Sequence, residues 1–161
     1  MKGNSFPLLA NYSKRFNDDR GYLDVLYESQ HIVLKRSFSK KGVFRGMHIQ
    51  VAPYLQTKLI RVVDGRIIDF LVDFEDKENN ITWKEITPVD EWVKIAPNYA
   101  HGFYAMEDTT FEYICDGEYK ETSEISFSIF GFLEQEVNIK KPLVSDKDLH
   151  SRPLAVTVRD K

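Results

Sequence analysis

Short apolar runs separated by turn-forming residues dominate the hydrophobic pattern of this chain. Few positions repeat with the 3.6-residue period of a helix. Strand-like runs occupy residues 31–34, 59–63, 67–74, 93–96, 111–115 and 125–130. We expect the first of these runs to be an edge strand or an exchanged one. Several short strands at this spacing are typical of an all-β sandwich or barrel.

The two longest runs carry more detailed predictions. Asp64-Gly65 separates residues 59–63 from residues 67–74, and both of its residues tolerate positive φ, so a β-hairpin is expected there. The second run is apolar on both faces apart from Asp69 and Asp73. Such a strand is covered on both sides, which favours a sandwich whose outer face is also buried, as in a dimer.

The end of the chain departs from the strand pattern. Ser145-Asp146-Lys147-Asp148 resembles a helix-capping sequence and predicts a short helical turn. With 161 residues and 18.8 kDa, the chain is long enough for one domain with its own core. We therefore expect a single domain over residues 1–161, an all-β jelly-roll barrel with a short C-terminal helical appendage.

Composition narrows the class of protein. Aromatic residues reach 13%, a level that pleated strands accommodate well. The net charge of −3 and the pI near 5.8 argue against a nucleic-acid partner. Cys115 is the single cysteine, which excludes an intrachain disulfide and favours a reducing compartment. The apolar run at residues 6–10 is too short for a signal sequence or a membrane span, so we expect a cytoplasmic protein without a membrane partner.

Candidate chemistry gathers in two neighbouring strand-like segments, residues 45–50 and 56–61. On a strand, His48 and Gln50 share one face, while their apolar neighbours point to the other. Polar groups that point into a sheet interior are costly unless they meet a partner or a ligand. Together with Lys58, this pattern predicts a site that binds an anion and moves a proton.

Arg45 does not fit the alternation of a regular strand. It stands three residues before His48, so the two side chains would point to opposite faces. Two explanations are open. Gly46 could form a β-bulge that turns the Arg45 side chain to the same face as His48, or Arg45 could belong to a neighbouring surface.

Metal and nucleophile chemistry are both disfavoured by the residues. Gln50 is a poor ligand where a second histidine would be needed, and His101 lacks an adjacent carboxylate at metal-ligand spacing. Cys115 stands alone in an apolar strand and is interpreted as a small core residue. Neither a Gly-x-Ser-x-Gly motif nor a phosphate-binding glycine loop is present. We therefore expect acid–base chemistry on an anionic substrate, with no metal and no cofactor.

Five motifs in order carry a resemblance to a known family. They are Asp19-Arg20-Gly21-Tyr22, residues 42–50, residues 56–65, residues 95–103 and Ser145-Asp146-Lys147-Asp148. Together they resemble the dTDP-4-dehydrorhamnose 3,5-epimerases, which are nucleotide-sugar epimerases of the cupin class. The resemblance spans nearly the whole chain. It implies a metal-free cupin jelly roll that forms a homodimer and acts on a nucleotide-diphosphate 4-keto sugar.

The resemblance also implies catalytic roles by motif. His48 would be the base, and Asp148 would orient it. Tyr113 would be the proton donor on the opposite face, and Lys58 would lie near the developing enolate oxygen. The chemistry is reasonable for these groups, because a ketone acidifies the hydrogens on both neighbouring carbons and a neutral histidine, with a reference pKa of about 6.5, can remove one.

The remaining site residues are expected to bind substrate. Arg20 and Arg45 would hold the diphosphate, and His101 would line the sugar pocket. Gln50 belongs to the same predicted set through its place in the motif. Tyr119 would either stack on a nucleobase or fill the mouth of the barrel.

Departures from the family pattern concern the substrate. Thymidine-specific members carry Gln and Asn where this chain has Val33 and Lys35, and a glutamate is replaced by Val25. Those positions touch the nucleotide in the relatives, so we expect a GDP-linked substrate as well as a dTDP-linked one. The sugar would be a 4-keto heptose or 6-deoxyhexose of the kind used in capsule or O-antigen synthesis. The stretch between His101 and Tyr113 is one residue shorter than usual, which leaves open inversion at only one carbon.

Two alternative functions are also considered, a 3,4-ketoisomerase and a non-catalytic binding module. Cupin 3,4-ketoisomerases typically carry Arg-Gly-x-His-Ala-His, whereas Ile49-Gln50 stands here in place of Ala-His. A non-catalytic sugar-nucleotide binding module would keep the pocket without needing His48, Lys58 and Asp148 together.

Overall fold

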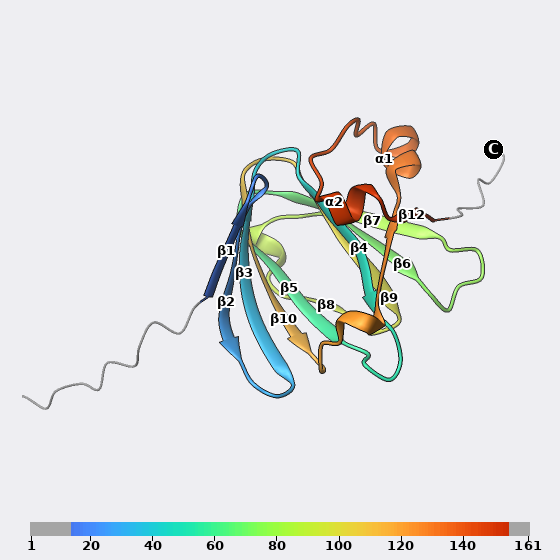
Figure 1. The fold of residues 1–161 in the computed structure, drawn as a ribbon. Helices are drawn as coiled ribbons and strands as arrows, with labels where there is room; N and C mark the ends of the chain where they lie inside the picture. The colour runs from blue at the N-terminus through green and yellow to red at the C-terminus, as the bar shows by residue number, and fades with distance from the viewer. Residues whose placement is uncertain (1–13, 155–161) are drawn as a thin grey trace, which may run out of the picture.

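The computed structural model describes residues 14–154, so the apolar run at residues 6–10 lies outside the described residues. Two six-stranded sheets face each other (Figure 1). In spatial order the first sheet contains β1 (Lys14–Asp18), β2 (Gly21–Glu28), β3 (Ile32–Ser39), β10 (Thr109–Asp116), β5 (Thr57–Asp64) and β8 (Val93–Ile95). The second contains β12 (Arg152–Pro153), β11 (Glu124–Ser128), β4 (Phe44–Gln50), β9 (Tyr99–Ala105), β6 (Ile67–Asp73) and β7 (Ile81–Ile86). This arrangement confirms the all-β jelly-roll prediction.

Helices are few and short. They are η1 (Pro88–Asp90), η2 (Glu121–Ser123), α1 (Phe130–Glu136) and α2 (Asp146–Leu149). None of the helices within the described residues has the length and apolar character that a membrane crossing requires.

The space between the sheets holds one apolar cluster. It draws side chains from both sheets, because alternate residues of each strand point inward. Its buried members are Ile60, Val62, Ile67, Ile86, Ile95, Phe103 and Phe111. This cluster fills one part of the barrel interior and leaves the rest to polar residues.

A second apolar cluster lies on the outer face of the second sheet, beneath α1. Phe70 of β6 meets Phe132 of α1 edge to face, and Leu133 is completely buried there. The two apolar faces of β6 are therefore covered by the barrel interior and by the chain's own helix. The apolar outer face of β6 is thus covered within the chain itself, and the predicted dimer stays a prediction.

The predicted hairpin at Asp64-Gly65 is wrong. β5 pairs with β10 and β8, whereas β6 pairs with β7 and β9, so the turn carries the chain from one sheet to the other. Gly65 has φ of 90°, and a Cβ there would lie 2.5 Å from the carbonyl oxygen of Asp108. The sequence correctly indicates a tight turn at Asp64-Gly65. The same turn residues, however, occur in a hairpin and in a connection between two sheets.

Two strand predictions also need correction. β3 lies between β2 and β10, so it is an interior strand and not an edge or exchanged one. The run at residues 125–130 is strand only as far as Ser128, because Phe130 begins α1. A helix of seven residues is too short to leave a clear 3.6-residue period in the sequence.

The C-terminal capping prediction is confirmed. Ser145 is the N-cap of α2, and its Oγ accepts a hydrogen bond from the backbone N–H of Asp148 at 3.1 Å. α2 contacts β4 and β11. This contact places the short helix behind the strand that carries His48.

Candidate active site

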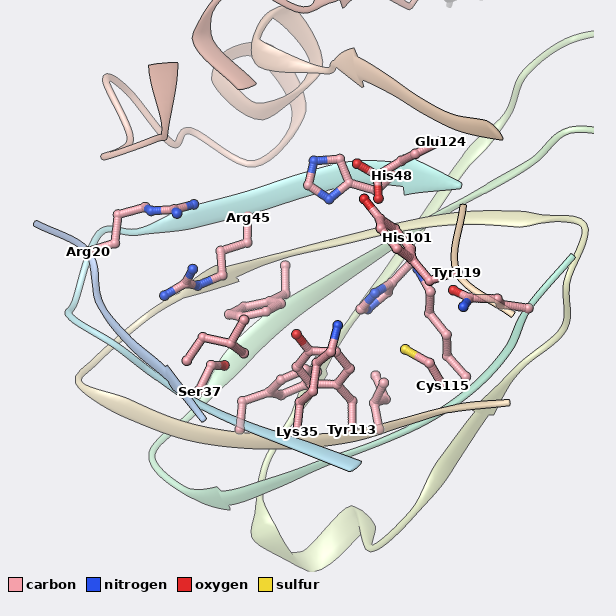
Figure 2. Close-up of a pocket in the computed structure, with 16 residues that line it drawn as sticks. Arg20, Lys35, Ser37, Arg45, His48, His101, Tyr113, Cys115, Tyr119 and Glu124 are labelled. Atoms are coloured by element: carbon pink, nitrogen blue, oxygen red, sulfur yellow. The ribbon is translucent and has the colours of Figure 1, made fainter. Parts of the chain in front are cut away.

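A cavity of about 270 Å³ lies between the two sheets, near the lower end of the ~300–1,000 Å³ range of ligand pockets. Figure 2 shows the polar side chains that point into it from both walls. Seven of the nine predicted site residues line this cavity: Arg20, Arg45, His48, Lys58, His101, Tyr113 and Tyr119. Of the other two, Asp148 lies behind His48, and Gln50 is buried elsewhere.

A β-bulge explains how Arg45 and His48 reach the same cavity. The register between β4 and β9 shifts between these two residues, which are three positions apart. Gly46 has φ of 118°, and a Cβ there would lie only 2.6 Å from the Cα of Gly102. Of the two explanations for Arg45, the bulge is therefore the one that the structure shows.

His48 and Asp148 form a hydrogen-bonded pair at one wall of the cavity. His48 Nε2 and Asp148 Oδ1 are 2.7 Å apart, and the carboxylate side chain is 2% exposed. Burial alone would raise the pKa of Asp148, but the hydrogen bonds with His48 and with the backbone N–H of Gly46 hold it below its usual value. An ionised carboxylate at Nε2 favours the neutral tautomer that carries its hydrogen there, which leaves Nδ1 as the basic nitrogen.

Tyr113 and Lys58 enter the cavity from the opposite sheet. Burial raises the pKa of the Tyr113 phenol, so this group is protonated at neutral pH. Burial lowers the pKa of Lys58, whose cross-strand neighbour on β10 is Cys115. Within residues 14–154 Lys58 forms no ion pair, so its charge is available to a ligand. Cys115 is buried, as its interpretation as a small core residue predicts, and it also lines the cavity beside Lys58.

Two arginines mark the end of the cavity near β1 and β3. Arg45 donates from Nε to Ser39 Oγ at 2.9 Å and from Nη2 to the Phe38 carbonyl at 3.3 Å. Arg20 donates from Nε to Asp18 at 3.0 Å. Burial and the nearby charge of Arg20 lower the pKa of Arg45. Two guanidiniums held this close together suit an anion with several oxygens.

A second histidine–carboxylate pair lies deeper in the second sheet. His101 Nε2 and Asp69 Oδ1 are 2.6 Å apart, and both side chains are buried. Sequence reasoning assigned no role to Asp69, because its partner stands 32 positions away on another strand. The sequence signal that could have identified Asp69 is its place as a charged residue inside the otherwise apolar run of β6. In the described part of the chain, no three histidine, cysteine or carboxylate groups lie close enough together to hold a metal ion.

Gln50 and Tyr119 are connected through the segment after β10. Gln50 does not line the cavity; its Oε1 accepts a hydrogen bond from the backbone N–H of Lys120 at 3.1 Å. Tyr119, the preceding residue, lines the cavity and is half exposed. Gln50 therefore contacts the segment that carries Tyr119 and, unlike the other predicted substrate-binding residues, does not line the cavity.

Comparisons with known proteins identify the family. The family model described as dTDP-4-dehydrorhamnose 3,5-epimerase matches residues 8–155. A dTDP-4-dehydrorhamnose 3,5-epimerase from Shigella flexneri is 30% identical over 86% of each chain. The crystal structure of the corresponding epimerase from Sulfolobus tokodaii is 33% identical with a TM-score of 0.66, over 86% of this chain and 85% of that one.

A third relative was solved with ligands. The dTDP-4-dehydrorhamnose 3,5-epimerase from Bacillus anthracis, whose crystal contains TDP and PPi, is 27% identical with a TM-score of 0.67, over 88% of this chain and 91% of that one. The family match thus spans all of the described strands and the five sequence motifs. This chain belongs to the dTDP-4-dehydrorhamnose 3,5-epimerase family and is an isomerase of the epimerase class, built on a cupin jelly roll.

Proposed function

We propose that this enzyme inverts one or both carbons next to the ketone of a nucleotide-linked 4-keto sugar, at position 3, position 5 or both. The observation that carries this proposal is the placement of His48 and Tyr113. They enter one cavity from opposite sheets, so a sugar ring between them would meet a base on one face and an acid on the other.

The first step forms an enolate. His48 takes the proton from the carbon beside the carbonyl, and the electron pair of that C–H bond moves toward the carbonyl oxygen. Asp148 stabilises the imidazolium that results, as a buried carboxylate does in other histidine pairs. Lys58 stabilises the enolate oxygen, because an ammonium in a desolvated cavity interacts strongly with charge that develops in the transition state.

The second step inverts the carbon. Tyr113 gives its proton to the opposite face of the same carbon, the carbonyl re-forms, and the phenolate remains on the enzyme. The imidazolium then releases its proton to solvent and the phenolate recovers one. Each well-placed acid or base of this kind contributes about 10²–10⁴ in rate.

In this proposal the two arginines, Arg20 and Arg45, bind the diphosphate of the substrate. Tyr119 contacts the nucleobase at the mouth of the cavity. The names of the relatives point to dTDP-linked sugars. Lys35, which lines the cavity, departs from the thymidine pattern and supports a GDP-linked 4-keto heptose or 6-deoxyhexose as the second candidate substrate. The wider proposal is a cytoplasmic homodimer that serves the synthesis of a surface polysaccharide such as capsule or O-antigen.

Two alternative functions are less well supported. A 3,4-ketoisomerase would need a second catalytic group near the position of Gln50, and this side chain instead contacts the backbone of Lys120. A non-catalytic binding module would have no use for His48 paired with the buried carboxylate of Asp148, which is costly to desolvate.

Deuterium exchange tests the proposal. The enzyme is incubated in deuterated water with dTDP- and GDP-linked 4-keto-6-deoxyhexoses and with a GDP-linked 4-keto heptose. Label at both flanking carbons indicates a 3,5-epimerase, and label at one indicates a single-site enzyme. Label with migration of the carbonyl would favour the ketoisomerase, and tight binding without any label would favour the module.

A matched pair of variants assigns the base. His48→Asn should abolish labelling while leaving nucleotide affinity unchanged. His31→Asn, which changes an exposed histidine outside the cavity, should label like wild type. Persistent labelling in His48→Asn would exclude His48 as the base.

A further inference from the structure

Lys35 is a cavity residue to which the proposed reaction assigns no chemical role. It lies on β3 directly across from Tyr113 on β10. Its Nζ is 5.6 Å from the centre of the Tyr113 ring. Figure 2 shows both side chains pointing into the cavity from the same wall. The lysine therefore lies over the ring of the residue that acts as proton donor.

The Lys35 side chain has no anionic partner of its own. Among residues 14–154 it forms no ion pair and no hydrogen bond, although it is partly buried. Cations that line a cavity without a carboxylate partner are positioned to act on a ligand or on a group that becomes charged. The other charged and titratable groups that line the cavity with Tyr113 are Arg20, Lys35, Arg45, His48, Lys58, His101, Cys115, Tyr119 and Glu124.

Other cations in the cavity are already engaged or lie farther along the wall. The charge of Arg45 also lowers the pKa of Tyr113, but its guanidinium is held by Ser39 and by the Phe38 carbonyl, beside Arg20 at the anion-binding end. Lys58 lies across from Cys115, two positions further along β10 than Tyr113. Lys35 alone among these cations is the direct cross-strand neighbour of Tyr113.

We propose that Lys35 is a positioning residue that stabilises the phenolate left on Tyr113 after its proton has been given to the sugar. The inference rests on the proposed function, in which Tyr113 is the acid. The Oη–H bond of Tyr113 breaks as the new C–H bond of the substrate forms, and the negative charge stays on the phenolate. Lys35 transfers no proton itself; its positive charge offsets this negative charge until solvent returns a proton to Tyr113.

Physical chemistry explains why such a group is needed. Burial raises the pKa of Tyr113, which means that its phenolate is poorly solvated in the cavity. A cation over an aromatic ring is attracted to the electron-rich face, and the attraction increases when the ring system acquires a negative charge. Removal of the cation should therefore slow the step that creates the phenolate and leave the step at His48 unchanged.

The experiment separates these two steps. Abstraction by His48, followed by return of a deuteron to the same face, labels the sugar without inversion. Inversion requires Tyr113 as well. In deuterated water both rates are followed by NMR, with whichever dTDP- or GDP-linked 4-keto-6-deoxyhexose the wild-type enzyme labels. Lys35→Met keeps the length of the side chain and removes its charge, Lys35→Arg keeps the charge, and Lys94→Met changes an exposed lysine on β8.

We expect Lys35→Met to slow inversion about tenfold relative to label without inversion. Lys35→Arg should recover most of the rate, and Lys94→Met should match wild type. If label and inversion fall together in Lys35→Met, or if inversion is unchanged, the role of Lys35 is wrong while epimerisation stands. If the wild-type enzyme labels no candidate sugar, the proposed function fails first and the role of Lys35 fails with it.

Discussion

His48 Nε2 and Asp148 Oδ1 are joined by a 2.7 Å hydrogen bond although 100 residues separate them in the chain. The connection depends on α2, a helix of only four residues whose N-cap is Ser145. The C-terminal appendage thus contributes to the candidate active site, since it supplies the carboxylate that is hydrogen-bonded to the proposed base.

Replacement of this carboxylate should mainly affect kcat. Asp148→Asn can still hydrogen-bond to His48, but it no longer stabilises the imidazolium or enforces one tautomer. We expect kcat for inversion to fall by about 10²–10⁴ with little change in KM. Asp146→Asn, an exposed position on the same helix, is the control. Equal kcat values for the two variants would remove Asp148 from the mechanism.

Lys58 should determine the alkaline side of the activity profile. Burial lowers its pKa below the ordinary lysine value of 10.5, so the ammonium is lost at lower pH than in an exposed lysine. Because the enolate needs the charged form, kcat should decline as pH rises through this lowered pKa. Lys58→Met should reduce kcat by about 10²–10³ and abolish this decline. A profile that is the same in both proteins would exclude Lys58 from enolate stabilisation.

A row of alternating charges on the outer face of the first sheet should contribute to stability. Glu112 is 4% exposed and accepts from Arg36 Nε at 2.9 Å and from Arg61 Nε at 2.8 Å. Because both arginines are partly exposed, we expect Glu112→Gln to lower the free energy of unfolding by roughly 2 kcal/mol at neutral pH, less than for a fully buried pair. Glu85→Gln, which breaks a surface pair with Arg66, should cost less than about 1 kcal/mol.

The contribution of Glu112 should also depend on pH. Burial would raise its pKa, but the hydrogen bonds from Arg36 and Arg61 hold it below the ordinary value of 4.5. A carboxylate whose folded-state pKa is lowered stabilises the protein above the unfolded pKa, and this stabilisation is lost as pH falls through the folded value. Urea denaturation should therefore show the difference between wild type and Glu112→Gln shrinking below pH 4.5. A constant difference would contradict this assignment.

Helix α1 should stabilise the fold by covering β6. Leu133 is fully buried among residues of β4 and β6. Leu133→Ala should cost about 3 kcal/mol of unfolding free energy, within the usual range for a buried leucine, whereas exposed Gln135→Ala should cost little. The loss should be the same at all protein concentrations. A cost that vanishes at high concentration would mean that a partner subunit, and not α1, covers this face.

Local patterns were enough to predict much of this protein. Strand-like runs and turn residues indicated a jelly roll, and Ser145 was correctly expected to cap a short helix. The motifs around Arg20, His48 and Lys58 identified the family, because each depends on residues that are adjacent in sequence. The bulge at Gly46 was also foreseen as one of two explanations, since the parity of Arg45 demanded some irregularity.

Tertiary structure decided what depends on distant contacts. Whether Asp64-Gly65 closes a hairpin or turns a corner is set by which strands β5 and β6 pair with, and both outcomes use the same turn. Asp69 became a site residue only because β6 lies beside β9, which carries His101. Sequence alone determined which chemical groups are available, because residue types and short spacings can be recognised without the fold. The folded chain determined which of these groups meet, because hydrogen bonds and burial join residues that are far apart in the sequence.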